Sequence, residues 1–192
     1  MIAIIDYGAG NIKSLQFALD RLGVKSVLTS DLNKILNADK VIFPGQGAAK
    51  SAMEKLKQQG LDKLILNLKQ PVLGICLGMQ LLCEFTEEGN IEGLGIIKGT
   101  VKRFTNEVKV PQMGWNSIHR LNGPLFDGIE AGAYMYLVHS YFVPDLKETM
   151  AISNYNGAYS VALQKDNFYG VQFHPEKSST KGQLLLNNFL KL

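Results

Sequence analysis

The sequence predicts an α/β protein: a doubly wound, mostly parallel central sheet with additional antiparallel strands in the second half of the chain. Two observations carry this prediction. Short apolar runs alternate with segments of helical periodicity up to Phe85, and after Gly89 short β-rich pieces are separated by Gly, Asn, Asp and Pro. The 192 residues, 46% of them hydrophobic, can build a sizeable core, and no repeat, low-complexity tract or linker divides them. We therefore expect a single domain over residues 1–192.

The first half reads as strands and helices in alternation. Apolar runs of the kind found in strands covered on both faces predict four strands, at Met1–Asp6, Ser26–Thr29, Lys40–Phe43 and Pro71–Ile75. Apolar residues at helical spacing predict a first helix that starts after Asn11, as its N-cap, and ends at Gly23. The same spacing predicts helices at Met53–Gln59, Leu61–Lys69 and Leu77–Phe85.

The second half reads as strands joined by turns, closed by one helix. The predicted strands are Gly95–Phe104, Ser117–Arg120, Tyr134–Val143, Ala151–Tyr155, Ser160–Gln164 and Phe168–Phe173, and the helix is Lys181–Leu190. In a doubly wound sheet, functional residues are expected where parallel strands end at their carboxyl side.

Composition excludes several classes of function. A formal charge of +3, from 20 Lys+Arg and 17 Asp+Glu, does not argue for nucleic acid, and no apolar run is long enough for a membrane span. Two cysteines suit a reducing cytoplasm better than a disulfide framework. No spacing suggests a metal site, and Lys13 stands where the dinucleotide fingerprint after Gly8 needs a third glycine or alanine. We expect neither a metal nor another cofactor.

Cys76 is the first candidate for chemistry. In Gly74-Ile75-Cys76-Leu77-Gly78 a strand turns sharply into a helix, a pattern typical of an elbow that presents a nucleophile above the sheet. The helix N-terminus favours a thiolate, and the Leu77 N–H can face a developing oxyanion. A small buried cysteine between two packing glycines would give the same pattern. Cys83, inside an apolar helical stretch, is predicted to be core.

His174 is the predicted base. It follows a strand, and in an extended segment its side chain points the same way as that of Glu176, which can fix the imidazole tautomer. A surface histidine with a chance acidic neighbour remains an alternative. His139 lies in an aromatic strand and could line a site but has no acid nearby, and His119 reads as an exposed strand residue.

Pro44-Gly45-Gln46-Gly47 ends another predicted strand. Two glycines permit positive φ and a close approach of the backbone, as an oxyanion loop requires, although a plain turn would look the same.

Together these segments resemble the class I, or triad, glutamine amidotransferases. The resemblance lies in Gly74-Ile75-Cys76-Leu77-Gly78-Met79-Gln80, Pro44-Gly45-Gln46-Gly47 and Gly170-Val171-Gln172-Phe173-His174-Pro175-Glu176. Within this class, three further segments resemble the glutaminase branch that serves imidazole glycerol phosphate synthesis in histidine biosynthesis: Asp6-Tyr7-Gly8-Ala9-Gly10-Asn11, Pro111-Gln112-Met113-Gly114-Trp115-Asn116 and Tyr136-Leu137-Val138-His139-Ser140-Tyr141-Phe142. The resemblance implies a flavodoxin-like fold of this class.

The resemblance also implies an activity and a division of roles. Cys76 would attack the side-chain amide of glutamine, His174 would shuttle protons, and Glu176 would orient His174. Oxyanion stabilisation would come from Leu77 and the loop of Gly45, Gln46 and Gly47, and glutamine would be held by Gln80 and the backbone of Ser140, Tyr141 and Phe142. Gln46 departs from the small apolar residue, commonly valine, expected at its position.

The resemblance further implies a partner. Ammonia would pass to a separate cyclase subunit with a (β/α)₈ barrel, which couples it to a phosphorylated ribulosyl aminoimidazole-carboxamide nucleotide. The implied interface residues are Asn11, Met113, Trp115, Tyr134, Tyr136 and Lys177. Two alternatives stay open at this point: another glutaminase or a free-standing Cys–His hydrolase of the same superfamily, and a catalytically silent scaffold.

Overall fold

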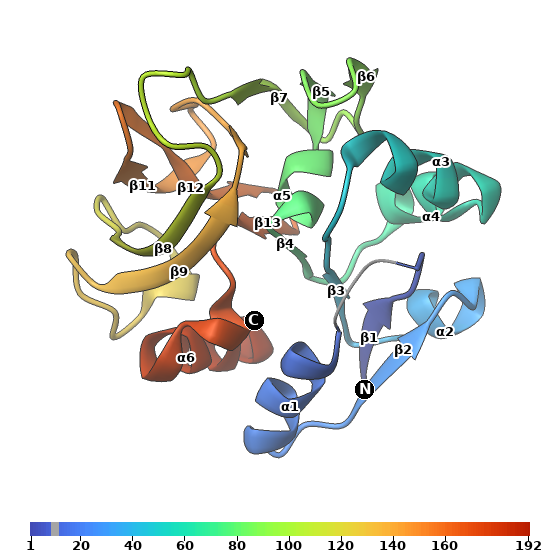
Figure 1. The fold of residues 1–192 in the computed structure, drawn as a ribbon. Coiled ribbons are helices and arrows are strands. Elements are labelled where there is room, and N and C mark those ends of the chain that lie inside the picture. Colours follow the sequence, from blue (N-terminus) through green and yellow to red (C-terminus); the bar gives the residue numbers. More distant parts are fainter. Residues whose placement is uncertain (9–11) are drawn as a thin grey trace.

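A computed structural model describes residues 1–8 and 12–192. Its centre is a seven-stranded sheet in the order β11-β12-β13-β4-β3-β1-β2 (Figure 1). The strands are β1 (Ile2–Ile5), β2 (Ser26–Thr29), β3 (Lys40–Phe43), β4 (Val72–Ile75), β11 (Thr149–Asn154), β12 (Ala158–Lys165) and β13 (Phe168–Val171). β2, β1, β3, β4 and β13 run parallel, while β12 and β11 extend the sheet antiparallel. The order of the parallel strands is the flavodoxin-like one.

Helices cover both faces of this sheet. α1 (Lys13–Arg21) and α6 (Ser179–Lys191) share one hydrophobic cluster, and α2 (Leu32–Leu36), α3 (Ala49–Gln58), α4 (Leu61–Asn67) and α5 (Leu77–Leu81) share the other (Figure 1). β1 shows why its sequence is apolar throughout: Ile2 and Ile4 face the first cluster, whereas Ala3 and Ile5 face the second. The doubly wound architecture predicted from the sequence is therefore confirmed.

Two smaller sheets and two short turns complete the fold. A four-stranded sheet has the order β10-β7-β5-β6, formed by β5 (Cys83–Thr86), β6 (Ile91–Glu92), β7 (Ile97–Arg103) and β10 (Tyr141–Phe142). β8 (Gln112–Ser117) and β9 (Tyr134–His139) form an antiparallel pair. The 3₁₀ turns are Pro124–Phe126 and Pro175–Lys177. The predicted antiparallel texture is present, although β5 and β7 pair in parallel.

The structure corrects several predicted elements. The helix expected to reach Phe85 ends at Leu81, because Cys83–Thr86 pairs with β6 and β7 instead. The strand expected at Ser117–Arg120 is wrong: the strand is β8, and only His119 forms an isolated bridge, with Ile152. The piece expected at Tyr134–Val143 divides into β9 and β10.

The short helix α2, between β2 and β3, is absent from the elements predicted from the sequence. Asp31 caps it by accepting hydrogen bonds from the backbone N–H groups of Asn33 and Lys34. α3 begins at Ala49, four residues before the predicted start at Met53. The N-cap role expected of Asn11 lies outside the described residues. Across residues 1–8 and 12–192, no helix combines the length and apolar character needed to cross a lipid bilayer.

Candidate active site

Cys76 lies on a strained elbow between β4 and α5. Its backbone has φ 53° and ψ −109°, a conformation that side-chain-bearing residues rarely adopt, and its side chain is nearly buried. Glycines let the surrounding backbone close around the turn: a Cβ on Gly78 would lie 2.0 Å from the Phe43 carbonyl oxygen, and one on Gly74 would lie 2.8 Å from the Met79 nitrogen. The glycines flanking Cys76 are therefore required by packing.

His174 and Glu176 meet beside this elbow. His174 Nδ1 lies 2.9 Å from Glu176 Oε1, and each side chain is 6% exposed. Because Nδ1 faces the carboxylate, Nε2 is the ring nitrogen left to interact with Cys76, whose Sγ lies 3.7 Å from the Val138 carbonyl oxygen. Burial alone would lower the pKa of His174, but the hydrogen bonds to Cys76 and Glu176 together outweigh burial and raise it to about 10. The ring is therefore well suited to take the thiol proton.

Glu176 binds His174 through one oxygen. The second, Oε2, is buried and has no hydrogen-bond partner in the part of the chain that the structure describes. The backbone fixes the same unit from the other side, since the His174 N–H donates to the Tyr136 carbonyl at 2.9 Å. A carboxylate, an imidazole and a thiol in this order form the arrangement of a hydrolytic triad.

A cavity of about 430 Å³ opens at Cys76 and His174. Its walls bring together most of the residues predicted for oxyanion stabilisation and substrate binding: Gly45, Gln46, Gly47, Leu77, Gln80, Ser140 and Tyr141. Phe142 does not line it, and its ring instead stacks on Phe104 with centroids 4.6 Å apart.

The two glycines of the predicted oxyanion loop, Gly45 and Gly47, serve different purposes. Gly47 has φ +98°, whereas Gly45 lies so close to α5 that a Cβ there would be 2.5 Å from the Gly78 nitrogen. The Tyr7 hydroxyl donates to the Pro44 carbonyl at 2.8 Å and holds the start of the loop. Burial, and secondarily the proximity of Cys76, raises the pKa of Tyr7, so this donor stays protonated.

Comparison with known proteins decides the family. The sequence model of class-I glutamine amidotransferases matches residues 3–192. The chain belongs to this family. The imidazole glycerol phosphate synthase subunit HisH of Bacteroides fragilis is 53% identical over 194 residues, covering 100% of this chain and 99% of the relative. The same protein of Haemophilus influenzae is 52% identical over 192 residues, with 99% and 96% covered.

Solved structures support the same fold. A putative GMP synthase component from Thermoplasma acidophilum superposes with a TM-score of 0.77 at 20% identity and covers 99% of this chain and 92% of its own. PurLQS from Thermotoga maritima gives 0.73 at 16% identity, with 99% and 97% covered. These likenesses concern the fold of the amidotransferase.

Gln172 is a site residue of this amidotransferase that sequence reasoning did not single out. It is fully buried, its Nε2 lies 3.6 Å from Cys76 Sγ, and its Oε1 accepts a hydrogen bond from Gln80 Nε2 at 2.9 Å. Gln80 Nε2 also donates to the Tyr141 carbonyl at 2.8 Å. Both Gln80 N–H groups thus hold protein atoms. The sequence does carry one signal for this residue, because Gln172 is a polar residue within the apolar run that precedes His174.

His139 supports the site without being a base. Its Nδ1 lies 2.7 Å from the Tyr141 carbonyl oxygen, to which it donates. Burial lowers the pKa of His139 to about 4, with a smaller contribution from the neighbouring His174, so the ring is neutral at physiological pH. Tyr141 therefore receives donors from both His139 and Gln80 at one carbonyl.

Glu88 is a second residue that sequence reasoning did not single out. It lines the cavity, accepts a hydrogen bond from the Ala49 N–H at the start of α3, and has its pKa raised by burial. It follows β5, which the sequence misplaced as helix, so its position at the site was not foreseeable from local pattern.

The residues implied at a partner interface gather on β8 and β9. Met113, Trp115 and Tyr134 are 67%, 52% and 59% exposed, and the Trp115 ring meets that of Tyr136 edge to face. Lys177 Nζ lies 5.9 Å from the Tyr136 ring centre and also lines the cavity. Asn11 lies outside the described residues.

The remaining candidates take no part in the site. Cys83 is fully buried, as predicted, though on β5, and burial raises the pKa of its thiol to about 12. His119 is exposed and contacts Ser117. No group of three metal-ligating side chains occurs among residues 1–8 and 12–192.

Proposed function

We propose that this amidotransferase is the glutaminase subunit of an imidazole glycerol phosphate synthase, with residues 1–192 as one domain. It hydrolyses glutamine to glutamate and ammonia and supplies the ammonia to a cyclase subunit on a separate chain. The observation that carries the activity is that Cys76 and His174 line one cavity while Glu176 binds His174 from behind it. Two relatives more than half identical over at least 96% of their length support the choice of branch.

The chemistry follows from the order of the three side chains. Cys76 Sγ attacks the amide carbon of glutamine while His174 Nε2 takes the thiol proton and then delivers it to the leaving nitrogen, releasing ammonia. Water, deprotonated by His174, attacks the resulting thioester, which returns the proton to the sulfur and releases glutamate. Glu176 holds the imidazole in the tautomer this requires and stabilises its charged form.

Peptide N–H groups stabilise the oxyanion in this scheme. Leu77 follows the nucleophile at the positive end of a helix, and the Gly45-Gln46-Gly47 loop borders the same cavity. A peptide N–H at Gln46 does not depend on the side chain, so the departure from an apolar residue there is compatible with catalysis.

Groups at the cavity wall suit the amino-acid end of glutamine. Ser140 and Tyr141 present backbone, and Glu88 offers a carboxylate for the α-ammonium group. Gln80 contributes indirectly, by donating a hydrogen bond to the Tyr141 carbonyl and so holding that backbone in place. Phe142 contributes by packing, since its ring stacks on that of Phe104. Loss of the Glu88 charge in Glu88→Gln should raise KM for glutamine.

The exposed aromatic end of the β8–β9 pair is the proposed docking surface for the cyclase, a (β/α)₈ barrel. Large hydrophobic side chains as exposed as Met113, Trp115 and Tyr134, on one antiparallel pair of strands, are typical of an interface. Tyr136 and Lys177 extend the proposed surface, and the interface role expected of Asn11 concerns a residue outside those described. The free thiols of Cys76 and Cys83 suit a reducing cytoplasm.

Glutamate formation by the chain alone, with its cyclase, and with cyclase plus nucleotide tests this proposal. We expect slow hydrolysis alone and strong stimulation by the loaded partner. Cys76→Ala should abolish hydrolysis while its matched control, Cys83→Ala, keeps most of it, and a Cys76→Ala complex should still make imidazole glycerol phosphate from ammonium salt. Full activity of the lone chain would favour a free-standing hydrolase, and inactivity under all three conditions would favour a silent scaffold.

A further inference from the structure

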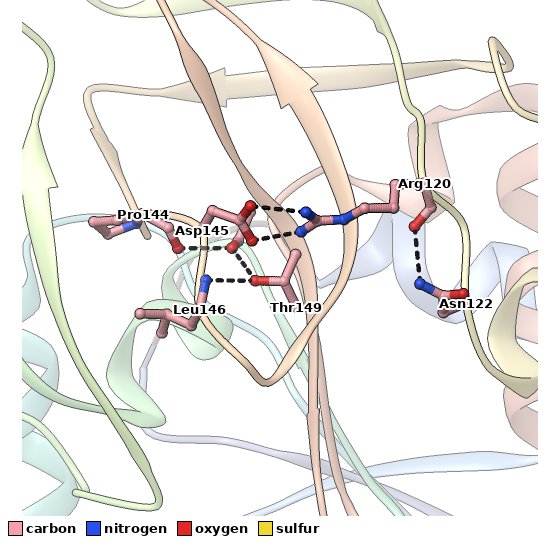
Figure 2. Close-up of polar contacts among 7 residues, drawn as sticks. Arg120, Asn122, Pro144, Asp145, Leu146 and Thr149 are labelled. Carbon is pink, nitrogen blue, oxygen red and sulfur yellow. Dashed lines mark hydrogen bonds and ion pairs between the residues drawn. The ribbon is translucent and has the colours of Figure 1, made fainter.

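Just after the proposed glutamine-binding segment, Pro144–Leu146 leads into a turn over residues 146–149, which the Thr149 N–H closes by donating to the Leu146 carbonyl at 3.2 Å. Side chains from three places in the chain meet at this turn: Arg120 and Thr149, which Figure 2 shows, and Ser160, which donates to the Pro144 carbonyl. Thr149 begins β11 and Ser160 lies in β12, so both belong to the antiparallel edge of the central sheet. The turn is thereby attached to the main sheet.

Two hydroxyl groups close this turn in a chain of hydrogen bonds with one possible direction. The Leu146 N–H donates to Thr149 Oγ1 at 2.8 Å, and Ser160 Oγ donates to the Pro144 carbonyl at 2.7 Å. Since an N–H can only donate and a carbonyl can only accept, the 2.6 Å contact between the hydroxyls must run from Thr149 to Ser160. Each hydroxyl donates once and accepts once, and such chains strengthen cooperatively.

The hydroxyl pair is more deeply buried than the ion pair at the same turn. Ser160 is fully buried, and its backbone N–H also holds the Val143 carbonyl at 2.9 Å. The ion pair between Arg120 and Asp145 on the outer side is 43% exposed at each side chain, and exposed pairs contribute little. The Thr149–Ser160 pair is therefore the buried side-chain support of the turn, and the Arg120–Asp145 pair is its exposed one.

The glutamine-binding segment is fixed at its other end as well. Two donors, Gln80 Nε2 and His139 Nδ1, bind the Tyr141 carbonyl, and the Phe104 N–H donates to the Ser140 carbonyl at 3.1 Å. Between these contacts and the hydroxyl pair lie two residues, Phe142 and Val143. The segment is thus held at both ends, once by the site and once by the hydroxyl pair.

We propose that Thr149 and Ser160 are positioning residues for glutamine: their hydroxyl pair holds the Ser140–Phe142 segment where its backbone meets the amino-acid end of the substrate. This inference rests on the proposed function. Cys76 and His174 are carried by β4 and β13, which the hydroxyl pair does not touch directly. Its loss should therefore weaken glutamine binding and leave the chemical step nearly unchanged.

A matched pair of substitutions at one position isolates the hydroxyl. Thr149→Val keeps the branched shape and removes the hydroxyl, whereas Thr149→Ser keeps the hydroxyl and removes a methyl group. Steady-state glutaminase kinetics of the complex with its cyclase should show KM for glutamine raised about threefold to tenfold in Thr149→Val and near wild type in Thr149→Ser, with kcat little changed in both. Ser160→Ala, which breaks the same chain at its next link, should repeat the effect of Thr149→Val.

Asn167→Ala is the control for a general loss of stability. Asn167 Nδ2 binds the Leu68 and Gln70 carbonyls at the opposite end of the sheet, so this variant should lower the melting temperature and leave KM unchanged. Unchanged KM in both Thr149→Val and Ser160→Ala, with an active wild type, would overturn the positioning role. An equal KM increase in Thr149→Ser and Thr149→Val would do the same. A wild-type complex that hydrolyses no glutamine would instead refute the proposed function.

Discussion

Substituting Cys76 by alanine and by glycine should reveal the strain stored in the elbow. With φ 53° and ψ −109°, any residue that has a Cβ is strained at this position, by about 1–3 kcal/mol, whereas glycine is not. Cys83 provides the matched control, because it is the same residue type, is fully buried and has no positive φ.

The expected magnitude follows from a difference between the two positions. Going from alanine to glycine costs about 0.5–1 kcal/mol in backbone entropy and about 0.8 kcal/mol in lost methyl burial. At Cys83 the full cost of roughly 1.5 kcal/mol should appear. At Cys76 the same cost is offset by the released strain, so Cys76→Gly and Cys76→Ala should have nearly equal stability.

Urea unfolding of the four variants measures these free energies of unfolding, with the slope m checked for constancy. The cost of Ala-to-Gly at Cys83 minus that at Cys76 estimates the strain directly, because the shared contributions cancel. Equal costs at both positions would show that the elbow stores no strain and that the backbone conformation at Cys76 is ordinary in energy.

Three further outcomes follow from the site. Glu176→Gln should lower kcat by less than the roughly 10²–10⁴-fold that a positioned proton-transfer group contributes, whereas Cys76→Ala should show no turnover. A wild-type kcat in Glu176→Gln would mean that the carboxylate is only a neighbour of His174. The pKa of His174 is raised from 6.5 to about 10, so its contribution to stability is complete below pH 6.5 and is lost as pH rises toward 10. Wild type should therefore lose stability relative to His174→Gln between pH 6 and pH 9 in urea unfolding, and parallel profiles would contradict the raised pKa. Gly78→Ala should destabilise the protein by about 3 kcal/mol in thermal unfolding, because its Cβ would meet the Phe43 carbonyl at 2.0 Å, and an unchanged melting temperature would refute this packing argument.

The placement of Cys76 and His174 at one site could be predicted because the signals of both residues are local. Cys76 stands between glycines at a strand end, and His174 is two residues from Glu176 in an extended segment. Each signal needs fewer than ten residues of context. These two segments lie far apart in the sequence, and the parallel pairing of β13 with β4 brings them together. The hydrogen bond between Gln80 and Gln172, which are 92 residues apart, is one result of this pairing.

The parts that sequence reasoning missed depend on contacts between distant segments. Cys83–Thr86 is compatible with a helix by its own residues, and pairing with β7 makes it a strand. Gln172 and Glu88 are ordinary polar residues in their local sequence, and only the folded chain shows that Glu88 lines the cavity and that Gln172 lies against Cys76. The local sequence pattern carries no information about contacts between residues that lie far apart in the chain.

β9 constrains how this protein can diverge. At its first residue, Tyr134, the strand faces solvent on the proposed docking surface, and at its other end His139 and the following Ser140 line the glutamine cavity. Between them the Tyr136 carbonyl accepts from the His174 backbone. Substitutions that adapt this strand to a different partner would also shift the catalytic base and the substrate segment. The proposed docking surface and the glutaminase centre therefore share one strand, so a change selected at one of them is also felt at the other.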